Sequence, residues 1–454
     1  MTMLIYFKIG NFLSFAEPQI LNMAAGKFRN FSERTYRNNT CKLLKFKSIY
    51  GANASGKSNL ISAFAWFQRF VVNGFKRGSY TLYCKLDEYY KEQPSSFEIK
   101  IKIEDKIFVY GFNTILNSSS VVKEYLYEEL KNQTKKYVFN REPLKGKFMV
   151  GTYISPVSMA ERIKIYAEDI KNDDSILFLK LMNQNKDSLY TKKSKLNVFK
   201  DVYNWIRYTL DVNTTGNSIT NYSFFANNDY LDMIVNKLNH FGLDIEKLNF
   251  AEISEEKLTS DFPKDILSDI KEELITQNSI QTDKSDAHNP SVMIRSNANI
   301  FVIGIDNENN FTYRTIELKH KYSFATFSLK EESDGTVRLL DIIEILLTQS
   351  KNKVYILDEV NRTFHPLLTI QFIKDFLELA KERNIQLIVT THESQLMDLK
   401  LLRKDEIGFV NKTDNGHSEM YSLSKFDIRF DKIAVTEYFK GHFKAIPEMS
   451  DKES

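Results

Sequence analysis

Cysteine is scarce in this 454-residue sequence, which contains only Cys41 and Cys84. Two cysteines give neither a disulfide framework nor the paired spacing of a zinc site, and such usage is typical of the reducing cytoplasm. None of the seven histidines lies in a cluster of Cys or carboxylate residues at ligand spacing. We therefore expect no disulfide scaffold and no structural zinc.

Long apolar runs and a large excess of one charge are absent as well. No uncharged apolar stretch reaches the ~18 residues that a membrane-spanning helix needs. Residues 1–11 lack the basic start and the apolar run of a signal peptide. With a formal net charge of +3, the composition neither indicates nor excludes nucleic acid as a partner. We expect a cytoplasmic protein without a membrane partner.

The sequence does have enough apolar material for a sizeable core. Hydrophobic residues make up 42 % of it and aromatic residues 13 %, which is typical of a globular protein. The length suits two or three domains, or one large domain with an insertion. No heptad pattern is present, so a long coiled coil is not expected.

The most informative motif is the eight-residue loop Gly51 to Ser58, which reads Gly-Ala-Asn-Ala-Ser-Gly-Lys-Ser. It lies between a predicted strand (46–50) and a predicted helix (59–70), the setting that the G-x-x-x-x-G-K-[ST] phosphate-binding pattern requires. Backbone N–H groups of such a loop wrap a triphosphate, and the helix points its positive dipole end at it. Lys57 would reach the β- and γ-phosphates, and the Ser58 hydroxyl would bind Mg²⁺. The predicted nucleotide-binding residues of the loop are Asn53, Ser55, Gly56, Lys57, Ser58 and Asn59.

Two acidic residues, Asp358 and Glu359, follow the apolar strand predicted at 354–357. A strand that ends beside the phosphate loop would let Asp358 hold Mg²⁺ together with Ser58, while Glu359 orients or deprotonates an attacking water. The structural alternative is a solvated turn after a core strand. The phosphate loop upstream favours the catalytic interpretation.

A histidine follows the next predicted strand, 386–390, in the segment Thr391-His392-Glu393. In that position His392 can contact the γ-phosphate and sense its presence. The alternative is a loop histidine without a function.

A fourth polar segment, 331–336, lies immediately before the helix predicted at 337–347. Its Ser333 and Gly335 are small residues at a helix start, which again makes a phosphate-binding end. An ordinary N-cap by Ser333 or Asp334 is the alternative.

The order of the predicted elements indicates the fold class. Apolar and polar residues alternate over 97–103, and Asp105-Lys106 then turns the chain into residues 107–115, which predicts an antiparallel hairpin. Helical patterns prevail from 148 to 298, and the strand–helix–strand order of a parallel α/β sheet returns afterwards. We predict a split nucleotide-binding core, with residues 1–147 and 299–454 separated by a helical insertion at 148–298. The other predicted elements are two short strands within 3–15, strands at 121–130, 136–139, 300–305 and 311–318, helices at 264–275 (Ile266, Leu267, Ile270 and Leu274 on one face) and 367–381, and polar loops at 213–228 and 277–289.

In this order the four motifs resemble the head of ATP-binding-cassette (ABC) ATPases, and more narrowly the bacterial AAA-type ATPases related to OLD proteins and SMC heads. The resemblance implies an α/β P-loop NTPase fold of the ABC/SMC-head type, in which a mixed sheet is joined by an antiparallel β lobe. No glutamine clearly fills the family's water- and metal-contacting loop, although Gln93 lies in a suitable region. The resemblance rests on residues 9–15, 51–59, 94–99, 332–336, 358–359 with 365–366, 391–394, 405–407, 421–423 and 445–447.

The resemblance also implies cofactors and partners. ATP with Mg²⁺ would be sandwiched in a head-to-head dimer, where Ser333 and Gly335 of one copy face the γ-phosphate held by Lys57 of the other. Relatives include the ATPase subunits of the PARIS and AbiL-type antiphage systems and of certain retrons, which work with a separate effector. We therefore expect a slow ATPase and homo-oligomer that holds and releases a nuclease or toxin, with a phage protein as the trigger.

Two other classes of ATPase remain as alternatives. A DNA-handling ATPase of the SMC or repair type would need a long coiled coil or a basic surface, and the energy subunit of a transporter would need a membrane partner. OLD proteins carry a Toprim nuclease after the ATPase, but the 62 residues that follow His392 are too few for one, so the effector is expected to act in trans.

Basic residues with aromatic residues between them gather in two stretches and would suit nucleic-acid phosphates. A solvated lysine-rich surface, or one that binds a phage protein, would look the same. These residues are Lys131, Lys135, Lys136, Arg141, Lys145 and Lys147, then Lys186, Lys192, Lys193 and Lys195, with Tyr137, Phe139 and Tyr190 among them.

Overall fold

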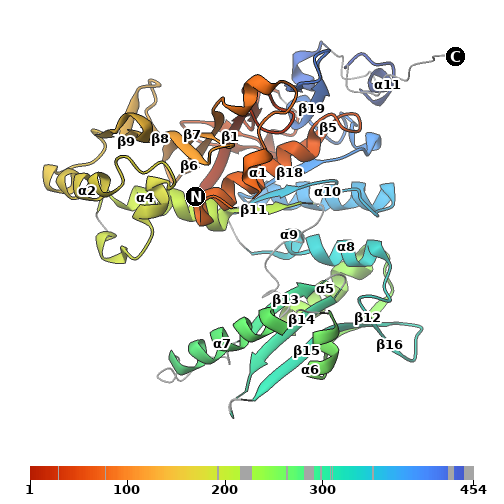
Figure 1. Cartoon of the computed structure of the whole chain (residues 1–454). Helices are drawn as coiled ribbons and strands as arrows, with labels where there is room; N and C mark the ends of the chain where they lie inside the picture. The colour runs from red at the N-terminus through yellow and green to blue at the C-terminus, as the bar shows by residue number, and fades with distance from the viewer. Residues whose placement is uncertain are drawn as a thin grey trace. The chain divides into compact units, whose positions relative to one another are not determined.

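The computed structural model forms two compact units (Figure 1). Unit 1 comprises residues 1–217, 349–361 and 372–454, and unit 2 comprises residues 218–348 and 362–371. The structure describes residues 1–28, 30–76, 78–191, 194–214, 228–261, 264–280, 291–296, 299–306, 308, 310–349, 352–427 and 434–443. Within these ranges, no helix has both the length and the apolar character needed to span a bilayer.

Unit 1 contains a six-stranded sheet in the order β11-β17-β18-β5-β19-β20, with only β20 antiparallel to its neighbour. Every residue of β5, β17 and β18 is buried, as expected for parallel strands covered on both faces. This burial explains the apolar runs of β17 and β18, whereas β5 also buries the polar residues Lys47 and Ser48. The strands predicted at 46–50, 354–357 and 386–390 are confirmed. The bounds are β5 (Phe46–Tyr50), β11 (Leu210–Asn213), β17 (Val354–Leu357), β18 (Gln386–Thr390), β19 (Ile407–Lys412), β20 (Ser418–Ser422), α1 (Lys57–Asn73), α10 (Pro366–Glu382) and α11 (Ala434–Phe439).

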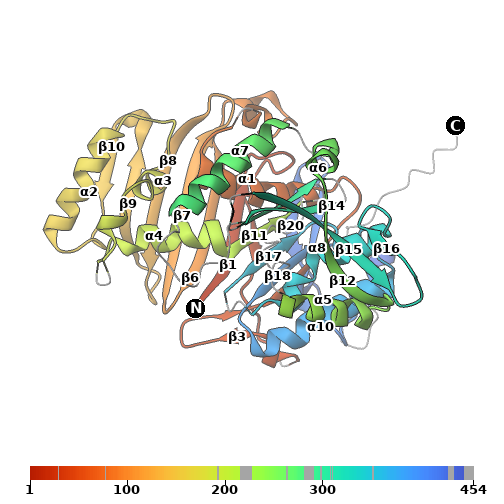
Figure 2. The same cartoon turned by 90° about the horizontal axis from the view of Figure 1, so that it is seen from below.

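A seven-stranded antiparallel sheet forms the β lobe of unit 1, in the order β10-β9-β8-β7-β6-β1-β2 (Figure 2). The predicted hairpin is confirmed, and Glu104 takes a left-handed φ of 52° in its turn. Helix α1 packs on this lobe: Phe64 stacks on Phe7, and Phe67 stacks on Phe112. The bounds are β1 (Thr2–Gly10), β2 (Gln19–Asn22), β6 (Ser95–Ile103), β7 (Lys106–Ile115), β8 (Ser120–Glu129), β9 (Lys135–Glu142), β10 (Lys147–Val150), α2 (Val157–Asp169), α3 (Phe178–Met182) and α4 (Asn197–Asn204), with the short pair β3 (Tyr36–Arg37) and β4 (Lys42–Leu43) outside it.

The prediction of two short strands within 3–15 was wrong. A single strand, β1, ends at Gly10, and the chain then makes a tight loop closed by a bridge between Phe12 and Phe15. Asn11 and Leu13 have positive φ angles of 49° and 50° in this loop. Left-handed residues cannot continue an extended strand, so the alternation does not persist past Gly10.

Unit 2 is built around a five-stranded antiparallel sheet in the order β12-β15-β14-β13, with β16 added on β15. Helix α7 contributes Leu267 and Leu274 to the core over this sheet (Figure 1). Ile266, predicted on the same face, is exposed instead. The bounds are β12 (Ile245–Glu252), β13 (Ser291–Ser296), β14 (Asn299–Ile305), β15 (Phe311–His320), β16 (Thr326–Ser328), α5 (Asn228–His240), α6 (Glu255–Asp261), α7 (Lys264–Ile280), α8 (Asp334–Ile342) and α9 (Glu344–Leu347).

The units divide the chain at other places than the predicted boundaries. Residues 148–217 belong to unit 1, where β11 extends the six-stranded sheet by pairing with β17. Strands β12 and β13, also inside the predicted insertion 148–298, share one sheet with β14 and β15. A four-residue strand such as β11 has too few positions for a period to show, so only long-range pairing identifies it. The predicted polar loops fall largely on 215–227 and 281–289, which lie outside the described residues.

Candidate nucleotide-binding site

The phosphate loop leaves β5 at Gly51 and enters α1 at Lys57. Gly56 has a φ of 114°, and a Cβ at that position would lie 2.2 Å from Ser418 Oγ. A Cβ on Gly51 would lie 2.2 Å from the Val410 carbonyl oxygen. Close packing therefore requires both glycines of the motif, and Gly56 is required by its backbone conformation as well.

A chain of hydrogen bonds between the side chains of Asn59, Ser14 and Ser418 holds this loop. Asn59 Nδ2 donates to Ser14 Oγ at 2.7 Å, and Ser14 Oγ lies 2.7 Å from Ser418 Oγ. Ser418 Oγ donates in turn to the Ser55 carbonyl oxygen at 2.6 Å. Asn59, which we predicted to bind nucleotide, thus holds the loop in place through its amide group.

Lys57 lies across the inside of the loop. Its Nζ donates to the carbonyl oxygens of Gly51 and Ala52 at 2.8 and 2.9 Å. Burial lowers the pKa of this ammonium group to about 8, and the negative charges of Glu359 and Asp358 oppose that shift. A phosphate group would add negative charge where the ammonium group now donates only to carbonyl oxygens.

The two acids after β17 are held by Thr390 at the end of the neighbouring strand. Thr390 Oγ1 donates to Asp358 Oδ1 at 2.6 Å and accepts from the Glu359 N–H at 2.7 Å. Asp358 is buried, whereas Glu359 has a left-handed φ of 47°. Non-glycine residues in that region carry strain and cluster at functional sites.

The segment that carries His392 is held by Asn361, which the sequence did not single out. Asn361 Oδ1 accepts from Thr391 Oγ1 at 3.0 Å and from the His392 N–H at 3.3 Å. Partial desolvation lowers the pKa of the imidazole, and the positive charge of Lys57 lowers it further. Both effects favour the neutral ring, which can accept or donate a hydrogen bond.

These groups meet because of the strand order. Strand β18 lies between β5 and β17 and is parallel to both, so the carboxyl ends of all three strands share one edge of the sheet. Ligands of open α/β sheets bind outside that edge. The structure thus brings together the predicted residues Lys57, Asp358, Glu359 and His392, and adds Thr390 and Asn361 as positioning residues.

The residues present fit ATP and Mg²⁺. The Ser55 hydroxyl is buried without a hydrogen-bond partner among the described residues, while the Ser58 side chain and Asn53 are exposed. Mg²⁺ is usually held by one or two carboxylates with substrate phosphates, which suits Asp358 with the Ser58 hydroxyl. The described ranges contain no group of three or more His, Cys, Asp or Glu residues that could hold a metal ion by themselves.

The Ser333 segment lies in unit 2, where Ser333 is the N-cap of α8. Its Oγ accepts from the Thr336 N–H at 3.1 Å, as the structural alternative predicts. A cavity of about 490 Å³ lies beside it, and Gly335 lines this cavity. A Cβ on Gly335 would lie 3.3 Å from the Thr363 carbonyl oxygen. The helix start is therefore both capped and open to a ligand.

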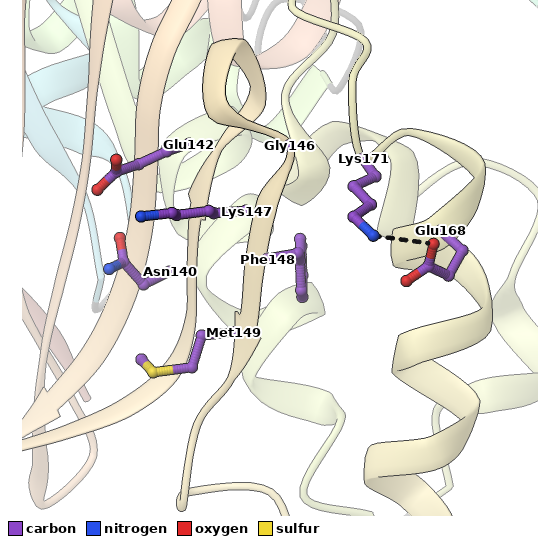
Figure 3. Close-up of a pocket in the computed structure, with 8 residues that line it drawn as sticks. All are labelled: Asn140, Glu142, Gly146, Lys147, Phe148, Met149, Glu168 and Lys171. Atoms are coloured by element: carbon purple, nitrogen blue, oxygen red, sulfur yellow. Dashed lines mark hydrogen bonds and ion pairs between the residues drawn. The ribbon is translucent and has the colours of Figure 1, made fainter.

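The predicted basic stretches do not form one cationic surface. Arg141 is buried and paired with Glu124, and Phe139 belongs to the core. Lys147 lines a cavity of about 430 Å³ with Asn140 and Glu142 (Figure 3). The same cavity contains the ion pair between Lys171 and Glu168 (3.5 Å). Carboxylates thus accompany the cations there. Lys192 and Lys193 lie outside the described residues, as does the family-like segment 445–447, and nucleic-acid binding stays a prediction.

A family model described as "AAA domain, putative AbiEii toxin, Type IV TA system" matches residues 48–398. The match spans the phosphate loop and the edge that carries Asp358 and His392. The chain belongs to this AAA family. Membership assigns it to the ATPases, which bind ATP, typically together with Mg²⁺. No curated protein matches the chain.

Solved structures similar to this AAA protein include heads of SMC proteins. An SMC head bound to the C-winged helix domain of ScpA is 13 % identical, with 92 % of this chain and 97 % of that chain covered and a TM-score of 0.38. The SMC head domain from Thermotoga maritima is 14 % identical, with 92 % and 98 % covered and a TM-score of 0.33. An SMC head with an extended coiled coil, bound to the C-terminal domain of ScpA from Pyrococcus furiosus, is 13 % identical, with 98 % and 100 % covered and a TM-score of 0.35.

Proposed function

We propose that this chain hydrolyses ATP slowly and uses the ATP-bound state to hold a separate nuclease or toxin, which it releases during phage infection. The observation that carries the ATPase part is the edge of the sheet where Lys57, Asp358 and Glu359 converge, with Thr390 bonded to both acids. The family description, which associates the AAA domain with a type IV toxin–antitoxin system, supports a role in a system with a toxic component. As part of the same proposal, this chain has the role that the ATPase subunits of the PARIS and AbiL-type systems have.

Each residue has a distinct task in the proposed reaction. Lys57 and the loop N–H groups bind the β- and γ-phosphates, and Ser58 with Asp358 holds the metal ion. Mg²⁺ bound there would neutralise charge that develops on the transferred phosphoryl group. Glu359 accepts a proton from the attacking water, and His392 donates a hydrogen bond to the γ-phosphate. Ser333 and Gly335 of a second copy complete the site.

The assignment of Glu359 as the general base is tested by the substitution Glu359→Gln. We expect this variant to bind ATP as tightly as the wild type while phosphate release falls by about 10²–10⁴-fold, because the general base is gone. Lys57→Ala should lose ATP binding itself. Turnover of Glu359→Gln at the wild-type rate would contradict the assignment.

The proposed binding of a separate effector is tested by affinity purification of the Glu359→Gln variant with ATP and Mg²⁺ from cells that express the genes flanking this one. A stoichiometric protein that leaves when ATP is removed would support the sensor role. Recovery of nucleic acid without any protein would instead favour a DNA-handling ATPase.

A further inference from the structure

The side chain of Gln68 on helix α1 connects this helix to strand β11. Its Nε2 donates to the carbonyl oxygens of Ile206 and Leu210, at 2.8 and 2.6 Å. Leu210 is the first residue of β11, and Ile206 lies in the turn that leads to it. Both acceptor residues are buried, so their carbonyl oxygens need partners within the protein. One amide group therefore holds α1, this turn and β11 together (Figure 1).

The turn before β11 has an unusual backbone conformation. Residues Trp205–Thr209 form a π-helical turn directly after α4. Such turns are rare, and they frequently occur at functional sites. Trp205 and Ile206 are buried and belong to the same hydrophobic core as the apolar face of α1. The turn is thus a packed element of unit 1, against which a bond from α1 can hold β11.

Strand β11 lies at the edge of the six-stranded sheet. It is four residues long, and among the described strands it pairs with β17 alone. A parallel pair of this length makes few ladder hydrogen bonds. The two hydrogen bonds from Gln68 therefore add an anchor for β11 that comes from outside the sheet.

The other end of β11 contacts the backbone of Asp358. The Asp358 N–H donates to the carbonyl oxygen of Asn213, the last residue of β11, at 3.0 Å. Asn213 is fully buried, and Asp358 is 2 % exposed. A shift of β11 along its axis would displace this carbonyl oxygen and the Asp358 backbone with it. Thr390 thus holds the carboxylate of Asp358, while β11 holds its main chain.

Helix α1 also carries the residues that bind phosphate and metal in the proposed reaction. Lys57 and Ser58 are its first two residues, and Gln68 lies about three turns further along. A hydrogen-bonded helix transmits a displacement as a rigid element. Gln68 therefore links the start of α1 to the end of β11, by a route separate from the pairing of β5, β18 and β17.

We propose that Gln68 is a positioning residue for the Mg²⁺ site: it fixes α1 to β11 and thereby sets where Asp358 lies relative to Ser58. This inference rests on the proposed function, because it takes Ser58 and Asp358 as the protein ligands of Mg²⁺. Mg²⁺ demands near-ideal octahedral geometry. Two ligands on different elements hold it well only when those elements keep a fixed separation, which the Gln68 amide group provides.

Calorimetric titration with ATP, with and without Mg²⁺, tests this role. Gln68→Met keeps the length of the side chain but removes the donor. We expect its ATP affinity without Mg²⁺ to be unchanged. The Mg²⁺ concentration that gives half of the full increase in ATP affinity should rise about tenfold, the lower end of the range for groups that orient metal ligands. Gln68→Lys keeps a donor for both carbonyl oxygens, as Lys57 does within the phosphate loop, and should restore the wild-type Mg²⁺ requirement.

Lys180→Met is the matched control. Lys180 Nζ donates to the carbonyl oxygen of Asn73, the last residue of α1, at 2.6 Å. The change thus also removes a hydrogen bond of α1, but none to β11, and should leave the Mg²⁺ requirement at the wild-type value.

Hydrogen exchange of the nucleotide-free protein gives a second readout. The amides of residues 205–213 should exchange faster in Gln68→Met than in the wild type, and not in Lys180→Met. If Gln68→Met does not fold, Gln68→Asn takes its place with the same expectations, because its shorter amide group cannot reach both carbonyl oxygens.

Asp358→Ala separates this inference from the proposed function. It should itself raise the Mg²⁺ requirement, and Gln68→Met should then have no further effect, because a residue that acts through Asp358 has lost its target. A raised requirement in Asp358→Ala beside an unchanged one in Gln68→Met overturns the positioning role and leaves the proposed function standing. An equal loss of ATP affinity with and without Mg²⁺ in Gln68→Met also overturns it, since Gln68 then only supports the fold of α1. No effect of Asp358→Ala removes the metal site itself, and this inference with it.

Discussion

Thr390 Oγ1 lies 2.6 Å from Asp358 Oδ1 and also accepts the Glu359 N–H at 2.7 Å. One hydroxyl group at the end of β18 thereby orients both acids at the end of β17. Groups that orient metal and water ligands in this way commonly affect activity by about 10–100-fold.

Thr390→Val is therefore expected to lower kcat by roughly 10–100-fold and to raise the Mg²⁺ concentration needed for half-maximal activity. Thr390→Ser, which keeps the hydroxyl, is the control and should retain most activity. Magnesium titrations of steady-state ATPase activity measure both quantities. An unchanged Mg²⁺ requirement in Thr390→Val would contradict the positioning role.

The pKa of about 8 at Lys57 predicts a pH dependence of ATP binding. Burial lowers the pKa in the free protein, and bound phosphate would raise it, so protonation and binding favour each other. Affinity should be constant below pH 7.5 and fall as pH rises through 8, by up to about tenfold per unit. Calorimetry from pH 7 to pH 9.5 measures this.

Lys57→Arg is the matched control for that titration, because a guanidinium group stays charged over the whole range. Whatever the absolute affinity of Lys57→Arg for ATP, this affinity should not change with pH above pH 7.5. A wild-type profile equally flat to pH 9.5 would disprove the lowered pKa.

Gly56→Ala should lose ATP binding by at least about tenfold, since the new Cβ meets Ser418 Oγ at 2.2 Å and any shift distorts the loop. Gly78→Ala is the control: Gly78 also has a positive φ, 94°, but nothing lies within 4 Å of its Cβ position. Equilibrium binding of a fluorescent ATP analogue compares the two. Equal affinities of the two variants for ATP would contradict the role of the close contact at Gly56.

Arg141→Ala should destabilise the β lobe by about 3–5 kcal/mol, because it leaves the Glu124 charge buried without its cation. Arg141 also donates to the carbonyl oxygens of Ile170, Asp173 and Ile176. Denaturant unfolding measures the loss. Lys145→Ala breaks an exposed pair with Glu142 and should cost less than about 1 kcal/mol. A similar cost for both variants would refute the burial argument.

The sequence by itself determined the chemistry-bearing segments. The strands β17 and β18 follow from a local rule, since a buried parallel strand is a largely apolar run. The phosphate loop follows from its glycines at fixed positions, and it places β5 before it and the Asp358–Glu359 pair beside it. Local patterns also predicted the β6–β7 hairpin, because the apolar residues of β6 alternate with polar ones and a turn at Asp105-Lys106 follows.

Only the tertiary structure decided which distant residues support those segments. Ser14 and Ser418 meet behind the phosphate loop, Thr390 reaches the acids, and Asn361 reaches the Thr391–His392 segment, all through contacts between residues far apart in the chain. The five-stranded sheet of unit 2 likewise depends on long-range pairing, and so does the place of β11 in the six-stranded sheet of unit 1. Neither a hydrogen-bond partner nor a strand neighbour leaves a periodic trace in the sequence, because both are set by how the folded chain packs.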